Sequence, residues 1–399
     1  MNQTYPTIRL KPGAQKRLMH GHPWAFSNEI AMDAAAKALE PGALVSIQTD
    51  NGEQLGVAIF NPHSLIAARL MSASPQAVID RTALRERIAH ARNMRDRLYD
   101  VPHYRLAHAE ADGLPGVAID RFDDVAVCQV NTAGMERLAD DIAAAVMEET
   151  GVKNVILRGD SPIRRLEGLD DSSRVVGPGL TGAVDVIENG VVFRADPMSG
   201  QKTGWFFDQR DNRAFMAKLA DGATVLDVYS HTGGFGLACA AAGAQHVTMV
   251  DRSETSLALA AEAASANDLA GRSAFHTADA FDDLAKRRDR AETFDIVISD
   301  PPAFVRAKKE LGAGVRGYRK LTRLAAKLVA PGGFLAVASC SHHVDREAFQ
   351  YQIGRGLQDA GRKAAMIRDA GAGPDHPIHP QLPESAYLKF VCLRLDQAG

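Results

Sequence analysis

The sequence predicts an α/β protein whose C-terminal half forms a doubly wound parallel sheet, preceded by a β-rich domain and an α+β domain. After about residue 191, apolar β-rich runs alternate with helix-like segments, which is the pattern of parallel α/β sheets. Residues 1 to about 75 contain short strands and turns, and the segment between these regions mixes both kinds of element. The expected domains are residues 1–75, 76–190 and 191–399.

Composition sets the class of protein. The chain has 399 residues, of which 46% are hydrophobic and 24% charged, with a net charge of −3. These proportions are typical of a globular protein of several domains, and no global charge indicates a nucleic-acid or membrane partner. Four cysteines without a Cys-x-x-Cys pair argue against disulfides and zinc, so we predict no metal site. Because residues 1–23 lack a secretory apolar stretch, we expect a cytoplasmic protein.

The first domain is predicted from strands at 44–47 and 55–60 around a turn at 50–52. The N-terminal part of this domain is positively charged, because four basic residues precede the first acidic one, Glu29. They are Arg9, Lys11, Lys16 and Arg17. They are candidates for RNA phosphate contacts, and a solvated terminal arm is the alternative.

The middle domain is predicted to begin with an amphipathic helix over about 80–99. A hairpin of strands 116–120 and 125–130, a helix over about 135–149 and a strand near 155–157 follow, and the domain ends near the turn at 188–190.

The C-terminal domain alternates regularly between strands and helices. We expect strands at 224–228, 246–251, 273–277, 294–300 and 334–339, and helices at 235–242, 256–267, 278–288 and 319–329. Parallel sheets of this kind bind ligands beyond the carboxyl ends of their strands. The residues that follow each strand are therefore the candidate site.

A glycine-rich turn, residues 227–236, follows the first of these strands and predicts a nucleotide-type ligand at a helix N-terminus. It does not fit Gly-x-Gly-x-x-Gly, which disfavours a dinucleotide-binding dehydrogenase. Asp251 ends the second strand, where a carboxylate can bind ribose hydroxyls, and Asp279 after the third could accept an adenine amino proton. A helix N-cap is the alternative role of both aspartates.

Asp300 follows the fourth strand, and two prolines force an extended turn after it. Cys340 follows the fifth strand. We expect the two side chains to face one substrate from neighbouring strand ends.

These motifs, in this order, resemble those of class I S-adenosylmethionine-dependent methyltransferases. They are Asp-x-x-x-x-Thr-Gly-Gly, the acidic end of the second strand, Asp-Pro-Pro-x-Phe and Ser-Cys-Ser. Over nearly its full length the chain is similar to the bacterial 23S rRNA cytosine-5 methyltransferases with an N-terminal PUA domain, through segments 22–27, 111–116, 202–211 and 387–389. The resemblance implies a PUA domain, an α+β middle domain and a Rossmann-like methyltransferase domain.

The resemblance also implies site residues. Phe207, Asp208, Gln209 and Arg210 would form a lid element beside S-adenosylmethionine, and the cofactor would be lined by Tyr229, Thr232, Gly233, Asp251, Asp279, Ala280 and Asp300. The chain departs from the family pattern at Ala303, where lysine is frequent, and at His342-His343, where a glycine is frequent.

The chemistry of cytosine-5 methylation requires a nucleophile, because carbon 5 becomes reactive only after a thiolate adds to carbon 6. Cys340 is the candidate nucleophile, and His342 or nearby Arg and Lys side chains would lower the pKa of its thiol. Asp300 would hold the cytosine amino group and a proton at N3. Cys128, Cys239 and Cys392 lie in strand-like or helical runs and are expected to be buried and inert. A core cysteine is also the alternative role of Cys340.

A basic segment follows Asp300. Between residues 306 and 323 a single acid, Glu310, stands among Arg306, Lys308, Lys309, Arg316, Arg319, Lys320 and Arg323. We expect a flexible loop, helped by Gly312 and Gly314, that binds the RNA backbone through Arg306, Lys308, Lys309 and Arg316. A solvated charge run is the alternative.

The sequence thus predicts an S-adenosylmethionine-dependent methyltransferase that makes 5-methylcytosine in 23S rRNA or a large-subunit precursor, with no membrane partner and with a homodimer left open. A guanine-directed rRNA methyltransferase and a non-catalytic RNA-binding assembly factor are the alternatives.

Overall fold

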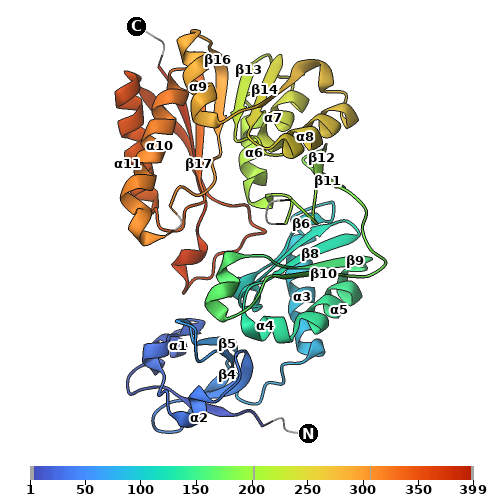
Figure 1. Cartoon of the computed structure of the whole chain (residues 1–399), viewed down its shortest axis with the longest axis vertical. Coiled ribbons are helices and arrows are strands. Elements are labelled where there is room, and N and C mark those ends of the chain that lie inside the picture. The colour runs from blue at the N-terminus through green and yellow to red at the C-terminus, as the bar shows by residue number, and fades with distance from the viewer. Residues whose placement is uncertain (1–3, 201–202, 306, 397–399) are drawn as a thin grey trace. The chain divides into compact units, whose positions relative to one another are not determined.

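The computed structural model describes residues 4–200, 203–305 and 307–396. The chain forms two compact units (Figure 1). Unit 1 contains residues 1–182, 197–204 and 374–385, and unit 2 contains residues 183–196, 205–373 and 386–399.

Unit 1 begins with a five-stranded sheet of order β1-β3-β4-β5-β2. Its strands are β1 (Thr7–Arg9), β2 (Trp24–Ala25), β3 (Ala43–Gln48), β4 (Gln54–Phe60) and β5 (Ala68–Ser72), joined by the short helices α1 (Gln15–Met19) and α2 (Ala34–Lys37). Ile8, Val45, Ile47 and Phe60 are buried in its core. The predicted strands at 44–47 and 55–60 lie within β3 and β4.

The second sheet of unit 1 has the order β10-β9-β8-β7-β6. Its strands are β6 (His103–His108), β7 (Val117–Phe122), β8 (Val125–Val130), β9 (Asn154–Gly159) and β10 (Ser172–Val176), and its helices are α3 (Arg81–Arg95), α4 (Ala133–Arg137) and α5 (Ala139–Thr150). Antiparallel β7 and β8 confirm the predicted hairpin. The helix expected over 135–149 is divided into α4 and α5.

Two later segments of the chain, 197–204 and 374–385, return to this sheet. Arg95 is fully buried and forms two hydrogen bonds with the Asp112 carboxylate, of 2.7 and 2.8 Å, and a third with the Asp375 carbonyl oxygen. Arg105 pairs with the buried Asp120, which also accepts a hydrogen bond from Thr203. Hydrogen bonds to members of two buried ion pairs therefore hold both returning segments in unit 1.

Unit 2 contains a seven-stranded sheet of order β15-β14-β13-β16-β17-β19-β18. Its strands are β13 (Thr224–Val228), β14 (His246–Asp251), β15 (Ser273–Thr277), β16 (Phe294–Ser299), β17 (Val329–Ser339), β18 (Ala364–Ala370) and β19 (Lys389–Leu395). The five predicted strands are confirmed and pair in parallel, whereas β18 and β19 add antiparallel pairs that we did not predict.

Helices cover both faces of this sheet (Figure 1). They are α6 (Arg210–Ala217), α7 (Gly234–Ala241) and α8 (Glu254–Ala266) on one face, and α9 (Ala280–Asp289), α10 (Leu311–Ala326) and α11 (Arg346–Ala360) on the other. A hairpin of β11 (Val184–Glu188) and β12 (Val191–Ala195) also belongs to unit 2, so the turn at 188–190 lies inside this unit. The three-domain division at residues 75 and 190 stays a prediction.

The prediction of a flexible loop over residues 306–323 is wrong. Lys308–Glu310 forms a 3₁₀ turn and α10 begins at Leu311, eight residues before the predicted start at Arg319. Gly314 is buried, and a Cβ atom there would lie 2.3 Å from Val305 and 2.6 Å from the Phe304 carbonyl oxygen. This glycine therefore allows close packing of the helix on the segment after Asp300, rather than flexibility.

In the part of the chain that the structure describes, no helix combines the length and the apolar character needed to cross a membrane.

Replacing the buried Arg95 with methionine should leave the Asp112 carboxylate without its partner and destabilise unit 1 by about 3–5 kcal/mol. Chemical denaturation followed by circular dichroism measures this as a lower midpoint for the transition of that unit. Arg97→Met removes an exposed arginine from the same stretch and should change the midpoint little. Equal midpoints for the two variants would contradict the structural role of the Arg95 ion pair.

Candidate functional site

The turn after β13 has an unusual backbone conformation. Tyr229, His231 and Gly233 have positive φ angles of 64°, 51° and 83°. Such angles cost about 1–3 kcal/mol at residues other than glycine, and they concentrate at binding sites. The turn leads directly into α7, with Gly233 at its N-cap position and Thr232 buried beside it. The predicted glycine-rich turn therefore lies at the start of a helix, as expected.

Asp251, at the end of β14, holds this turn in place. One carboxylate oxygen accepts the His231 N–H at 2.9 Å and the other accepts the Ser253 N–H at 2.8 Å. The N-cap of α8 is Ser253, whose side chain accepts the Ser256 N–H. The N-cap role considered for Asp251 is therefore wrong, and each of its oxygens keeps a further lone pair for a ligand.

Asp279 is the N-cap of α9. It is exposed, and one carboxylate oxygen accepts the N–H groups of Phe281 and Asp282 at 2.9 and 3.3 Å. Asp279 therefore has the N-cap role that was the alternative to ligand binding, and its second carboxylate oxygen stays available for a ligand. Ala280 is the buried first residue of α9.

Three carboxylates lie close enough to affect one another at the ends of β13, β14 and β16. Asp227 is buried, and one of its oxygens accepts the Gly236 N–H at 2.8 Å. Burial, together with the nearby charges of Asp300 and Asp251, raises the pKa of Asp227 to about 7. Its other oxygen is buried without a hydrogen-bond partner among the described residues. This concentration of negative charge suits a positively charged ligand.

The predicted lid element is anchored by a residue that we did not predict, Glu188. Its buried carboxylate accepts two hydrogen bonds from Arg213, at 2.6 and 2.8 Å, and lies 3.6 Å from the Arg210 guanidinium. Arg213 also donates to the Phe206 carbonyl oxygen at 2.7 Å, and the Phe206 ring packs edge-on against His231. These contacts bring the segment before α6 beside the turn after β13.

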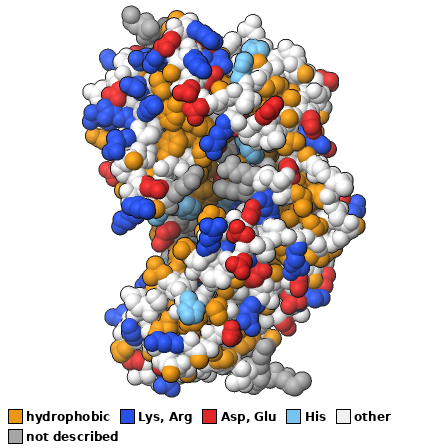
Figure 2. Space-filling view, viewed as in Figure 1, with side chains coloured by type: hydrophobic (Ala, Val, Ile, Leu, Met, Phe, Trp, Pro, Cys, Tyr) orange, Lys and Arg blue, Asp and Glu red, His pale blue; other side chains and the backbone are white. Residues whose placement is uncertain are grey.

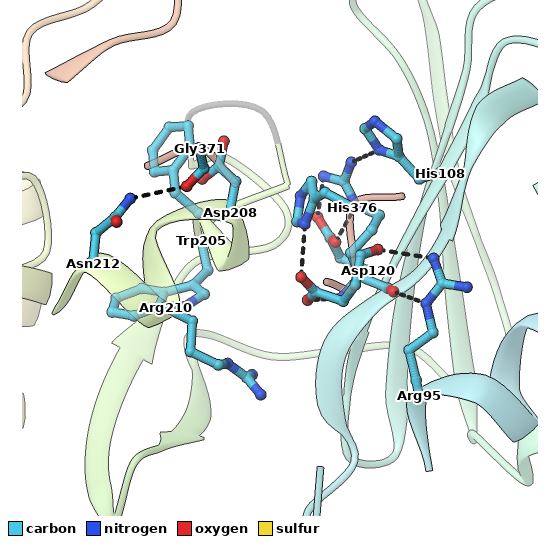
Figure 3. A network of polar contacts seen from close by, with 12 residues as sticks. Arg95, His108, Asp120, Trp205, Asp208, Arg210, Asn212, Gly371 and His376 are labelled. Carbon is cyan, nitrogen blue, oxygen red and sulfur yellow. Dashed lines mark hydrogen bonds and ion pairs between the residues drawn. The ribbon is translucent and has the colours of Figure 1, made fainter. Parts of the chain in front are cut away.

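Phe207, Asp208 and Gln209 form a buried 3₁₀ turn directly before α6. The Gln209 side chain accepts a hydrogen bond from Asn212, which donates a second one to the Gly371 carbonyl oxygen (Figure 3). Asp208 accepts a hydrogen bond from the Tyr387 hydroxyl. The turn is thus tied to residues that follow β18 and precede β19.

Cys340 directly follows β17, the strand next to β16 and Asp300. Its neighbours are anchored, because the Tyr318 hydroxyl of α10 forms hydrogen bonds of 2.8 Å with both Ser339 and Ser341. Ser299 pairs with Val337, so Cys340 lies about two residues further along the sheet edge than Asp300. The structure therefore brings these two predicted residues to neighbouring strand ends.

The other cysteines are buried, as expected. Cys128, Cys239 and Cys392 lie in β8, α7 and β19, and burial raises the pKa of each thiol, that of Cys392 to about 12. All four cysteines are in the described residues, and Cys340 is the partly exposed one.

Two further residues near Cys340 were not assigned a role from the sequence. Lys389 donates hydrogen bonds of 2.7 Å to the carbonyl oxygens of Ser341 and Val344. Tyr387 stacks on His342, with ring centroids 5.2 Å apart. A lysine at the start of an apolar strand is the signal that could have identified Lys389.

The N-terminal basic residues differ in their surroundings. Arg9, Lys11 and Lys16 are exposed. Arg17 donates to Glu29 at 3.2 Å and lies over the Phe26 ring, so it has a structural role in unit 1.

The second basic group lies at the start of α10. Lys308, Lys309 and Arg316 are exposed, whereas Arg319 pairs with Asp359 of α11, and Arg306 is outside the described residues. Figure 2 shows Lys and Arg side chains gathered over α10 and α11. The 3₁₀ turn before α10 and the first turns of the helix thus carry exposed cations.

Comparisons with known proteins agree with this arrangement. Residues 170–348 match the S-adenosylmethionine-dependent methyltransferase family, and residues 8–73 match the PUA-like domain. A methyltransferase solved in complex with SAH is 23% identical and has a TM-score of 0.83, covering 98% of this chain and 100% of that one. A SAM-dependent methyltransferase from Streptococcus mutans gives a TM-score of 0.82 at the same identity and coverage. These two structures show the shared fold.

Similarity to named relatives covers nearly the whole chain. Ribosomal RNA large subunit methyltransferase I of Aliivibrio fischeri is 37% identical over 393 residues, which cover 97% of this chain and 98% of the relative. The protein of the same name from Pseudoalteromonas atlantica is 34% identical over 390 residues, covering 96% and 98%. The chain therefore belongs to the ribosomal RNA large subunit methyltransferase I family, and it is an S-adenosylmethionine-dependent methyltransferase with an N-terminal PUA-like domain.

Proposed function

We propose that this protein forms 5-methylcytosine in 23S rRNA through a covalent adduct between Cys340 and the target base. The observation that carries the proposal is the position of Cys340. It is the partly exposed cysteine, it follows a strand of the parallel sheet, and it lies next to the strand end that carries Asp300.

The residues present fit S-adenosylmethionine. Its sulfonium and amino groups are positively charged, and the neighbouring carboxylates of Asp227, Asp251 and Asp300 provide the complementary charge. Asp251 has lone pairs left for the ribose hydroxyls, while Asp279 has one oxygen left for the adenine amino group. Tyr229, Thr232 and Gly233 would line the cofactor from the turn after β13, and Phe207–Arg210 from the segment before α6.

In the proposed reaction the Cys340 thiolate adds to carbon 6 of cytosine, and the electron pair of the 5,6 double bond becomes available at carbon 5. S-adenosylmethionine, when bound, would supply the methyl group: its sulfur–methyl bond would break as carbon 5 forms the new bond, and S-adenosylhomocysteine would be the leaving group. Asp300 accepts hydrogen bonds from the cytosine amino group and from a proton at N3, which relieves the negative charge that builds up in the adduct. Loss of the carbon 5 proton then restores the double bond and expels the cysteine sulfur as the thiolate.

The RNA partner must present its target base outside a helical stack to reach Cys340. Lys308 and Lys309 lie in the 3₁₀ turn just before α10 and Arg316 lies on α10, whose Tyr318 forms hydrogen bonds with the residues on both sides of Cys340. They would bind the phosphates near the target base. Arg9, Lys11 and Lys16 of the PUA-like domain would contact more distant phosphates.

The cofactor site is tested by calorimetry with S-adenosylmethionine. We expect Asp251→Ala to weaken binding at least about tenfold, because hydrogen bonds to a charged acceptor contribute about 1.5–3 kcal/mol each. Asp251→Asn keeps one acceptor oxygen and should lose less. Asp50→Ala removes an exposed aspartate of unit 1 and serves as the control. Wild-type affinity in Asp251→Ala would exclude a role in cofactor binding.

The RNA site is tested with a triple variant, Lys308→Ala, Lys309→Ala and Arg316→Ala. Losing three phosphate contacts should weaken RNA binding and reduce its dependence on log salt by about 2, while cofactor affinity stays unchanged. The matched control replaces Lys218, Lys327 and Lys363, which are exposed elsewhere in unit 2. If both triple variants gave the same salt dependence, α10 would have no specific role in RNA binding.

The proposed nucleophile is tested by trapping its covalent adduct with RNA. Target RNA that carries 5-fluorocytidine has no proton to lose at carbon 5, so the Cys340 adduct should persist through denaturing electrophoresis. Cys340→Ala should form no adduct and transfer no methyl group, yet bind the cofactor normally. Cys128→Ala, Cys239→Ala and Cys392→Ala should keep turnover, apart from stability lost through cavities. Near-normal methyl transfer by Cys340→Ala would instead favour guanine as the target.

A further inference from the structure

Lys389 is a buried lysine beside the proposed nucleophile. It is the first residue of β19 and lies opposite Ser339 in the antiparallel pair with β17. Only 4% of its surface is exposed. Its ammonium group donates to the carbonyl oxygens of Ser341 and Val344, both at 2.7 Å. Lys389 therefore holds the turn that directly follows Cys340.

Two carbonyl oxygens do not explain why the side chain is charged. A neutral donor would satisfy both oxygens, whereas burying an ammonium group is costly unless a negative charge lies nearby. The charged or titratable groups that act on Lys389 are Cys340, Asp345 and Arg346. Asp345, the N-cap of α11, and Arg346, its first residue, are both exposed. Of the two groups that can carry a negative charge, Cys340 acts on Lys389 more strongly than Asp345 does.

The titration of these groups is coupled. Burial lowers the pKa of Lys389 to about 8, and negative charge on Cys340 counteracts this by raising it. The same attraction, acting in the other direction, stabilises the thiolate at Cys340. The Tyr318 hydroxyl also lies near Cys340, but it is committed to hydrogen bonds with Ser339 and Ser341. Lys389 is therefore a buried cation placed to promote ionisation of the thiol.

We propose that Lys389 is a positioning residue for Cys340: it fixes the turn after the cysteine and places a positive charge beside the sulfur, so that the thiol ionises near neutral pH. This inference rests on the proposed role of Cys340 as the nucleophile. It gives Lys389 no direct contact with the RNA or the cofactor.

The test measures the alkylation rate of Cys340 by iodoacetamide as a function of pH, in the full-length protein without RNA. Peptide mass spectrometry separates Cys340 from the three buried cysteines. In the wild-type protein we expect a thiol pKa below the ordinary value of about 8.5. In Lys389→Gln, which keeps N–H donors for the turn but removes the charge, we expect the rate profile to shift by about one pH unit or more, with about tenfold slower alkylation at pH 7.

Lys389→Arg keeps the charge and should restore most of the reactivity, and Lys363→Met, an exposed lysine of unit 2, should behave as wild type. If the alkylation rate of Cys340 in Lys389→Gln depended on pH as in the wild-type protein, Lys389 would have only a structural role and the proposal would be overturned. A wild-type thiol pKa at or above about 8.5 would overturn it without any variant.

Methyl transfer by the same variants separates this inference from the proposed function. If Lys389→Gln shifts the thiol profile while Cys340→Ala still methylates RNA, Lys389 controls the thiol and the covalent mechanism is wrong. If Cys340→Ala is inactive but Lys389→Gln has a wild-type profile, the mechanism stands and the role of Lys389 is wrong.

Discussion

Parallel pairing of β13 with β14 on one side and with β16 on the other is the constraint on which the site depends. It brings the carboxyl ends of three strands to one edge of the sheet, although Asp251 and Asp300 are far apart in the sequence. The turn after β13 then adopts positive φ angles at Tyr229 and His231, and the Asp251 carboxylate stabilises that conformation through the His231 N–H. Strand pairing thus determines both the shape of the turn and the charge around it.

The charge distribution of unit 2 changes along the sheet edge. Asp227, Asp251 and Asp300 lie around the turn that would hold the cofactor. Because Asp227 is buried, ionising all three carboxylates is unfavourable unless a positively charged ligand is bound. Near Cys340, by contrast, Lys389 and the start of α10 supply positive charge. In the proposed function, a cationic methyl donor and an anionic RNA backbone would therefore meet complementary charge at neighbouring parts of one site.

Much of this organisation could be predicted from the sequence, because it depends on local patterns. Apolar periodicity predicted the five parallel strands and most helices of unit 2, while the glycine-rich turn and the residues after each strand indicated Tyr229, Asp251, Asp300 and Cys340. Residues next to strand ends can be found in this way because parallel strands end at a common edge. The resemblance to a methyltransferase family added the lid element before α6.

Tertiary contacts decided what local patterns left open. Asp279 caps α9, and Arg17 pairs with Glu29; either residue could equally have faced a ligand, and the sequence contains no signal that separates these roles. The segment over 306–323 looked flexible because of its glycines, yet Gly314 packs against Phe304 and Val305 inside a helix. The roles of Glu188 and Lys389 depend on partners that are distant in the sequence, such as Arg213 for Glu188 and Ser341 for Lys389. The sequence by itself determined which strands form and which chemical groups end them, whereas only the folded chain decided which groups are paired, because pairing depends on distant residues packing together.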